Sequence, residues 1–179
     1  TPEWINSTGA DTWRSTGDIH DCASSILDIY NQNIDLQKYN TQGCFNDMDM
    51  LVIGMHGKGL VGMGGCTEEE YRLHMSVWAM FASPLIIGCD IRNMDDETKN
   101  ILLNKDVIAV NQDPGARQPF RVGYDAWVRY LDNGDIAVLR VNPGDTERHI
   151  YAELPDLGIT LETGKKLLVR DLWTKEEFI

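Results

Sequence analysis

Two short apolar runs, residues 48–54 and 84–90, constrain the fold of this chain more than any other feature. Each is seven residues long, carries an aspartate at or near one end, and lacks the alternation of polar and apolar positions that a half-exposed strand shows. A continuous apolar run of this length is typical of a strand that is covered on both faces, as in a parallel sheet. Because segments with helical features precede and separate the two runs, the sequence predicts an α/β fold.

Four segments have the features of helices. The apolar residues of segment 21–36 recur at intervals of four, which marks one face of an amphipathic helix. Thr67 and Glu70 form a capping box, which predicts that a second helix starts there, and Pro84 ends it. The remaining helical segments are expected to begin at Asp95 or Asp96 and at Asp106.

The pattern changes to strands after residue 115. Residues 127–131 and 136–141 alternate between polar and apolar positions, and Asn133-Gly134 between them predicts a hairpin with a type I′ turn. Further strands are expected at 149–154 and 166–172. The sequence therefore predicts two domains, residues 1–115 with parallel strands and helices, and residues 116–179 with antiparallel strands.

Composition and charge exclude several classes of partner. The chain carries 16 Lys and Arg against 28 Asp and Glu, a net charge of -12, so most of its surface repels nucleic acid and suits a neutral substrate better. Polar residues interrupt every apolar stretch within about ten residues, too short for a membrane span. The four cysteines and four histidines show no ligand spacing, so we expect no metal and no cofactor. The compartment stays open.

Six glycines crowd the stretch 54–65, which follows the first apolar run. The stretch lacks the Gly-Lys-Ser/Thr ending of a phosphate loop and the spacing of the dinucleotide fingerprint. We therefore expect a flexible loop over a site rather than a phosphate cradle.

The segment 13–19, Trp-Arg-Ser-Thr-Gly-Asp-Ile, is the strongest candidate for chemistry. It places Arg14 and Asp18 four residues apart, and Gly17 allows the backbone to bend where Asp18 leaves a strand. From the residues alone, two interpretations stay open. Asp18 either points into a pocket or forms an ordinary surface pair with Arg14.

This segment resembles the acid/base segment of the α-galactosidases of glycoside hydrolase family 27, in which Trp-Arg, a few variable residues and Asp-Ile follow one another. Residues 45–54 and 105–114 resemble two further segments of that family. The resemblance implies a TIM (β/α)8 barrel followed by an antiparallel β domain. A complete barrel needs eight strands and about 250 residues, so we expect this chain to hold the C-terminal part of the barrel and to be a fragment.

The resemblance also implies roles for individual residues. Asp18 matches the general acid/base of a retaining hydrolase that removes terminal α-linked galactose, and Arg14 matches a ligand of the sugar hydroxyls. Asp49 and Met50 match the floor of the galactose pocket. Because Arg14 favours ionised carboxylates nearby, the acid needs a further negative charge to keep its proton, and the family's nucleophile would supply it.

Several departures from the family leave alternatives open. Phe45 and Met48 stand where the family has Trp and Pro, and two family segments, Lys-Tyr/Phe-Asp-x-Cys with the nucleophile and Cys-Glu-Trp-Gly at the sugar's 2-position, have no counterpart. The sugar is therefore open between galactose, N-acetylgalactosamine and β-L-arabinopyranose. A carbohydrate-binding fragment without catalysis is the alternative from another class. The missing N-terminal half, or a second copy of the chain, is the expected protein partner.

Overall fold

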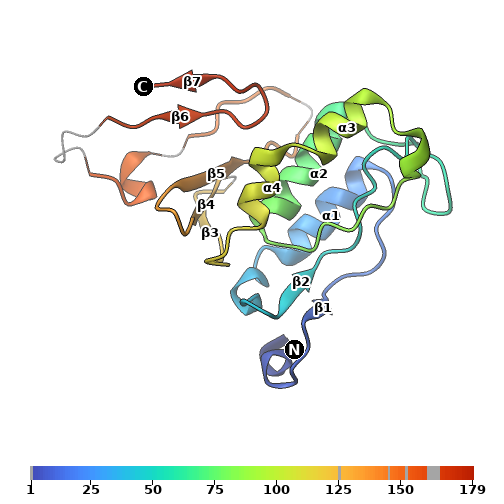
Figure 1. Ribbon diagram of the computed structural model, residues 1–179, viewed down its shortest axis with the longest axis horizontal. Helices are drawn as coiled ribbons and strands as arrows, with labels where there is room; N and C mark the ends of the chain where they lie inside the picture. The colour runs from blue at the N-terminus through green and yellow to red at the C-terminus, as the bar shows by residue number, and fades with distance from the viewer. Residues whose placement is uncertain (1, 125, 145, 152, 161–165) are drawn as a thin grey trace.

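A computed structural model describes residues 2–124, 126–144, 146–151, 153–160 and 166–179 (Figure 1). Its α-helices are α1 (Ala23–Asn33), α2 (Glu68–Met80), α3 (Asp96–Leu102) and α4 (Lys105–Asn111). Its strands are β1 (Thr12–Arg14), β2 (Phe45–Asp47), β3 (Phe120–Val122), β4 (Ala126–Tyr130), β5 (Ile136–Arg140), β6 (Val169–Arg170) and β7 (Glu177–Phe178). Short 3-10 helices are η1 (Pro2–Ser7), η2 (Gln37–Tyr39), η3 (Ile91–Asn93) and η4 (Leu154–Leu157).

Helix α2 is the centre of the molecule, and its start is the capping box predicted from the sequence. The Glu70 amide donates to the Thr67 hydroxyl (3.3 Å), and the Thr67 amide donates to the Glu70 carboxylate (2.6 Å). After the helix, Ala82 takes a positive φ of 52°, and Pro84 prevents any continuation. Trp78 near the end of α2 is fully buried, so this helix contributes its largest side chain to the core.

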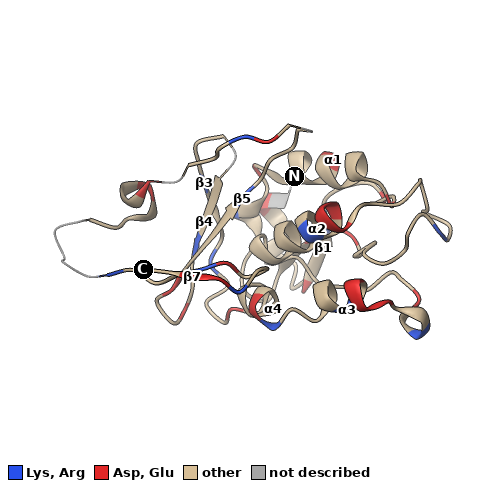
Figure 2. Cartoon of the chain, turned by 90° about the horizontal axis from the view of Figure 1, so that it is seen from above, with Lys and Arg blue, Asp and Glu red and all other residues tan. Residues whose placement is uncertain are grey.

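The other predicted helices also form. Helix α1 lies within the predicted segment 21–36 and buries the expected face through Ile26 and Tyr30. Asp95, and not Asp96, caps α3, because its carboxylate accepts from the Thr98 amide at 2.7 Å. Figure 2 shows acidic residues at the first turns of α2 and α3, where carboxylates stabilise the positive end of the helix dipole.

The two apolar runs do not form the buried strands predicted for them. They meet at one parallel bridge, where the Leu51 amide donates to the Ile86 carbonyl at 2.7 Å. Asp49, the second residue of the first run, has a φ of 82°, which interrupts an extended strand just before Leu51. Ile86 and Ile87 are 53% and 43% exposed, because no described segment covers the outer side of the second run, so it is not a buried strand.

The predicted hairpin forms, but its turn differs from the prediction. Strands β4 and β5 pair in antiparallel fashion with Trp127 opposite Leu139, and Trp127 is fully buried against Phe81, with ring centroids 4.8 Å apart. A type I′ turn needs positive φ at both Asn133 and Gly134, and only Gly134 has it, at 91°. The strands are joined by five residues, 131–135, rather than two, which removes the need for the second positive φ.

The strand predicted at 149–154 is wrong for the described residues of that range, because 149–151 and 153 are not extended in a sheet and Leu154 begins η4. Residue 152 lies outside the described residues. The strand predicted at 166–172 is confirmed in part as β6, which pairs with β7. Figure 1 shows this pair beside the C-terminus, away from the β1–β2 pair.

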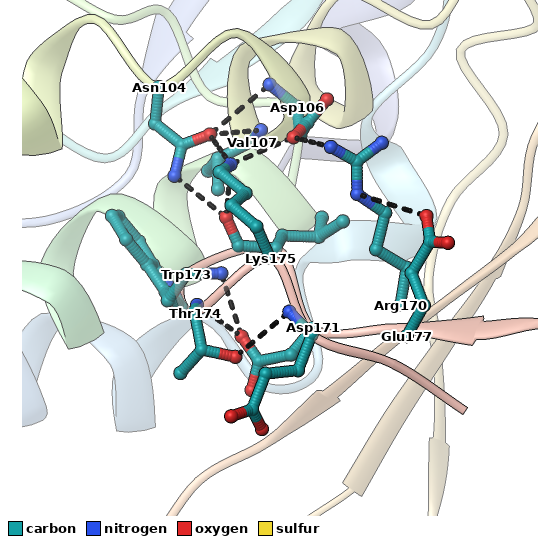
Figure 3. A network of polar contacts seen from close by, with 11 residues as sticks. Asn104, Asp106, Val107, Arg170, Asp171, Trp173, Thr174, Lys175 and Glu177 are labelled. Carbon is teal, nitrogen blue, oxygen red and sulfur yellow. Dashed lines mark hydrogen bonds and ion pairs between the residues drawn. The ribbon is translucent and has the colours of Figure 1, made fainter.

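Polar contacts hold the C-terminal segment against α4 (Figure 3). The Lys175 ammonium donates to Asp106 and to Asn104, each at 2.8 Å, and Arg170 pairs with Asp106 at 3.1 Å. The Asn104 side chain donates to the Leu172 carbonyl at 2.9 Å. The hydrogen bond from Lys175 lowers the pKa of Asp106, so this carboxylate is ionised beside the two cations.

Candidate active site

Arg14 brings together two of the predicted site residues that lie far apart in the sequence. Its guanidinium donates to the Asp18 carboxylate at 3.2 Å, to the Gly17 carbonyl at 3.1 Å, and to the Asp49 carboxylate. The Asp18 side chain is 86% exposed, whereas that of Asp49 is 14% exposed. One guanidinium therefore joins an open carboxylate to a nearly buried one.

The parallel pairing of β1 with β2 explains why these residues meet. Arg14, the last residue of β1, lies opposite Asp47, the last residue of β2. Parallel strands end at the same edge of a sheet, so the segments that follow them lie side by side. Asp18 lies four residues beyond one strand end and Asp49 two beyond the other, which places both carboxylates within reach of Arg14.

Asp49 is also the point at which three segments are tied together. Its Oδ2 accepts from the Ile19 amide at 2.7 Å and its Oδ1 from the Met50 amide at 2.7 Å. Its carbonyl accepts from the Trp78 indole at 2.7 Å, which links the site to α2. These donors hold the left-handed backbone of Asp49 and leave fewer lone pairs for a sugar than its sequence position alone suggested.

Met50 lies beside Gly88 of the second apolar run. A Cβ at Gly88 would come within 2.7 Å of the Met50 sulfur, so the thioether occupies the space that a side chain there would need. Met50 is only partly buried. The structure thus places it next to Asp49 on the side of the parallel bridge.

A second carboxylate, Asp21, is a residue that the sequence reasoning missed. It is completely buried, and it accepts from the Tyr71 hydroxyl at 2.9 Å and from the Gly57 amide at 2.6 Å. Its own backbone bonds to Val61 and Gly65 at 2.8 and 3.0 Å. The glycine-rich stretch 54–65 is thus bonded to the segment after Asp18 rather than loosely held. The sequence signal that could have identified Asp21 is its position, three residues after Asp18 and just before the amphipathic helix α1.

The part of the chain that the structure describes carries neither a metal cluster nor a membrane-spanning helix. No three His, Cys, Asp or Glu residues there are grouped so that they could hold a metal ion. None of the helices there combines the length and the apolar character that a membrane span requires. The four cysteines are free thiols.

Comparison with protein families assigns both parts of the chain. Residues 4–113 match the family model described as Alpha galactosidase A, which is more than half of the 179 residues. The chain belongs to the alpha-galactosidase A family. Residues 122–179 match a second model of this enzyme group, described as the alpha galactosidase C-terminal beta sandwich domain. The resemblance found in the sequence is thereby confirmed.

Individual members of the alpha-galactosidase group agree with this assignment. An alpha-galactosidase from Cyamopsis tetragonoloba is 39% identical over 174 residues, which cover 95% of this chain and 40% of the relative. The crystal structure of alpha-galactosidase I from Mortierella vinacea superposes with a TM-score of 0.81 at 31% identity, over 98% of this chain and 49% of that one. A β-L-arabinopyranosidase from Geobacillus stearothermophilus superposes with a TM-score of 0.78 at 28% identity, over 94% and 40%. The chain thus spans about two fifths of the length of the curated relatives that it matches.

Proposed function

We propose that this chain supplies the acid/base part of a retaining glycoside hydrolase that removes terminal α-linked galactose from oligosaccharides or glycoconjugates. The observation that carries the proposal is the contact of Arg14 with both Asp18 and Asp49, since of these two carboxylates only that of Asp18 is open to solvent. An exposed carboxylate can reach a glycosidic oxygen and then a water molecule. A carboxylate that is already bonded to two backbone amides cannot move between these tasks.

In this proposal Asp18 protonates the leaving oxygen in the first step and removes a proton from water in the second. Arg14 holds a sugar hydroxyl through the donors that its contacts leave free, because the guanidinium has five N–H groups in a rigid fork. Asp49 and Met50 form the floor of the pocket. Asp49 then acts twice, as a clamp on the backbone of Ile19 and as an acceptor for one sugar hydroxyl.

The nucleophile is proposed to come from a segment outside these 179 residues. Retaining enzymes place the two carboxyl groups about 5–5.5 Å apart, and the nucleophile has to attack the sugar freely. Asp49 is unsuited to that role, because its carboxylate is 14% exposed and accepts from Arg14, Ile19 and Met50. We therefore propose that residues 1–115 complete a TIM barrel with the chain that supplies the nucleophile, and that residues 116–179 belong to a C-terminal β domain.

A second candidate substrate is a β-L-arabinopyranoside. The structural similarity to the Geobacillus stearothermophilus enzyme favours it, and this sugar differs from α-galactose only in lacking the hydroxymethyl group at C5. The proposed roles of Asp18 and Arg14 are the same for both sugars.

The test measures hydrolysis of aryl α-galactosides, aryl α-N-acetylgalactosaminides and aryl β-L-arabinopyranosides in parallel. The purified chain should show no turnover by itself, and the protein that also carries the Lys-Tyr/Phe-Asp-x-Cys segment should prefer the α-galactoside. Turnover by the purified chain alone would overturn the proposed division of roles. A preference for another sugar would agree with the proposed mechanism but would show that the proposed substrate is wrong.

A further inference from the structure

The buried carboxylate of Asp21 joins three segments that surround the candidate acid/base. It accepts from Tyr71 on α2 and from Gly57 in the glycine-rich loop, and it belongs to the segment that carries Asp18. Asp21 is 0% exposed and Tyr71 is 3% exposed. A charged or polar group buried this deeply needs hydrogen-bond partners, and each of these groups has them within the described residues.

The direction of these hydrogen bonds is settled by the geometry around the Tyr71 hydroxyl. The His56 amide donates to the phenolic oxygen at 2.9 Å, so the proton of the hydroxyl is directed to Asp21, at 2.9 and 3.2 Å from its two oxygens. Burial raises the pKa of Tyr71, and the bond to Asp21 raises it further, so the hydroxyl keeps its proton. Tyr71 is therefore a fixed donor to a fixed carboxylate.

The loop on the other side of Asp21 is also fixed by close backbone contacts. A Cβ at Gly62 would lie 2.3 Å from the Gly57 carbonyl oxygen, and a Cβ at Gly65 would lie 2.8 Å from the Gly57 nitrogen. Neither position has room for a side chain, because two stretches of backbone pass each other there. The loop consequently gives Asp21 a rigid support through the amide of Gly57.

Asp18 is separated from Asp21 by two residues, about 10 Å of extended chain at most. Within this stretch, the Ile19 amide is bonded to Asp49 and the His20 amide to the Ser25 hydroxyl, at 2.7 and 2.9 Å. Bonds on both sides of the stretch leave Asp18 few ways to shift. Among the described residues, Arg14 is the only bonded partner of the Asp18 side chain, so backbone placement has to determine where the carboxylate lies.

We propose that Tyr71, acting through Asp21, is a positioning residue for Asp18. The inference rests on the proposed function, since it assigns a supporting residue to the acid/base named there. Tyr71 touches neither the substrate nor the reacting atoms. Its hydroxyl holds the far end of the segment 18–21, and loss of that hydroxyl lets Asp18 drift from the glycosidic oxygen.

The kinetic test replaces Tyr71 with phenylalanine in the active enzyme that contains this chain. A misplaced acid slows cleavage of poor leaving groups, which need a proton, much more than cleavage of good leaving groups, which do not. For Y71F we expect kcat/KM to fall roughly 10-fold on an alkyl α-galactoside and less than about 3-fold on a dinitrophenyl α-galactoside, within the range that small misplacements cost. KM for the activated substrate should change little.

Tyr30→Phe is the matched control, because Tyr30 is also a buried core tyrosine and its hydroxyl contacts Trp127 instead of Asp21. Its kcat/KM ratio between the two substrates should equal that of the unmodified enzyme. Equal slowing of both substrates in Y71F, or no change in either, would overturn the inference.

Hydrogen exchange separates this inference from the proposed function. In Y71F the amides of residues 17–22 and 56–57 should exchange at least several-fold faster than in Y30F at the same pH and temperature. If the unmodified enzyme cleaves no α-galactoside, the proposed function fails, and the exchange measurement still decides whether Tyr71 holds this segment. Unchanged exchange at residues 17–22 would refute the positioning role, whatever the substrate.

Discussion

The two family-matched parts of the chain differ in how they are held in place. Residues 4–113 contain every candidate site residue, and helices α1 to α4 bury their apolar faces in one core. Residues 122–179 contribute mainly β4 to that core, and no described residue after Val141 is buried. The C-terminal segment is held by surface pairs such as Lys175 with Asp106, and by Trp173, which packs against the core and donates to the Ser76 hydroxyl at 3.1 Å. It follows that the candidate site depends on residues 4–113, and that many residues of 122–179 can be substituted without disturbing the site.

The largest expected effect is at Asp18. Replacing Asp18 with alanine in the complete enzyme should slow poorly activated α-galactosides by about 10²- to 10⁴-fold, the usual contribution of general acid–base catalysis. Substrates with good leaving groups should be affected far less in the first step. Steady-state kinetics on a leaving-group series measures this, and D28N serves as the control, because Asp28 is an exposed acid on α1 that accepts a hydrogen bond from Gln32 and lies outside the candidate site. Uniform slowing of the whole series would reduce Asp18 to a structural residue.

The next largest effect is a loss of stability, and it concerns residues 122–179. Trp127 is fully buried and contacts Phe81 and Tyr30 of the first part, so Trp127→Ala should lower the free energy of unfolding by about 3–5 kcal/mol. Tyr151→Ala, at a position that is 77% exposed, should change it by less than about 0.5 kcal/mol. Urea denaturation measures both. Similar losses at the two positions would mean that the second part is held as tightly as the first.

A smaller effect is expected at Asp49. Asp49→Asn should weaken galactose binding by about 1.5–3 kcal/mol, the range for hydrogen bonds to a charged group. It should also lower the melting temperature, because an amide oxygen can replace only one of the two oxygens that now bond to Ile19 and Met50. Calorimetry of galactose binding checks the first expectation. Unchanged affinity together with a lower melting temperature would leave Asp49 as a clamp alone.

The smallest predicted effect, about 1.4 kcal/mol for each pH unit, concerns the pH dependence of stability and His74 on α2. Complete burial lowers the pKa of His74 from 6.5 to about 3, so the folded chain keeps this imidazole neutral while the unfolded chain protonates it below about pH 6.5. The unfolded state then binds the extra proton, and stability falls as the pH falls, by about 1.4 kcal/mol per pH unit between 6.5 and 3. His74→Gln should remove this part of the slope. Equal slopes between pH 7 and pH 5 in both proteins would contradict the assignment.

Much of the fold could be predicted because its signals are local. The capping box at Thr67, the cap at Asp95 and the period of segment 21–36 each depend on residues within a few positions of one another. The strand predicted for the first apolar run was wrong because Asp49 adopts a positive φ, and the one predicted for the second was wrong because Ile86 and Ile87 are exposed. The strand predicted at 149–154 failed for another reason. A strand-like sequence pattern does not supply a partner strand, and without a partner the segment 149–154 cannot form the hydrogen bonds of a sheet.

The sequence predicted which residues form the candidate site, but it could not predict how they are arranged in space. Resemblance to the family identified Arg14, Asp18, Asp49 and Met50, and the structure brings the first three into contact. It does not test their roles, which stay predictions. The hydrogen bonds of Asp21 that support this site could not be predicted from the sequence. Tyr71 and Gly57 lie 50 and 36 positions away from Asp21 along the chain, and only the fold brings them together.

The most direct test of the acid/base assignment is the product that the Asp18→Ala enzyme forms when azide is present with an activated α-galactoside. The glycosyl-enzyme should accumulate, because no base remains to activate water, and azide needs no deprotonation. We expect restored turnover and a galactosyl azide with retained anomeric configuration, identified by nuclear magnetic resonance. A galactosyl azide of inverted configuration would show that Asp18 was the nucleophile and would contradict the acid/base assignment.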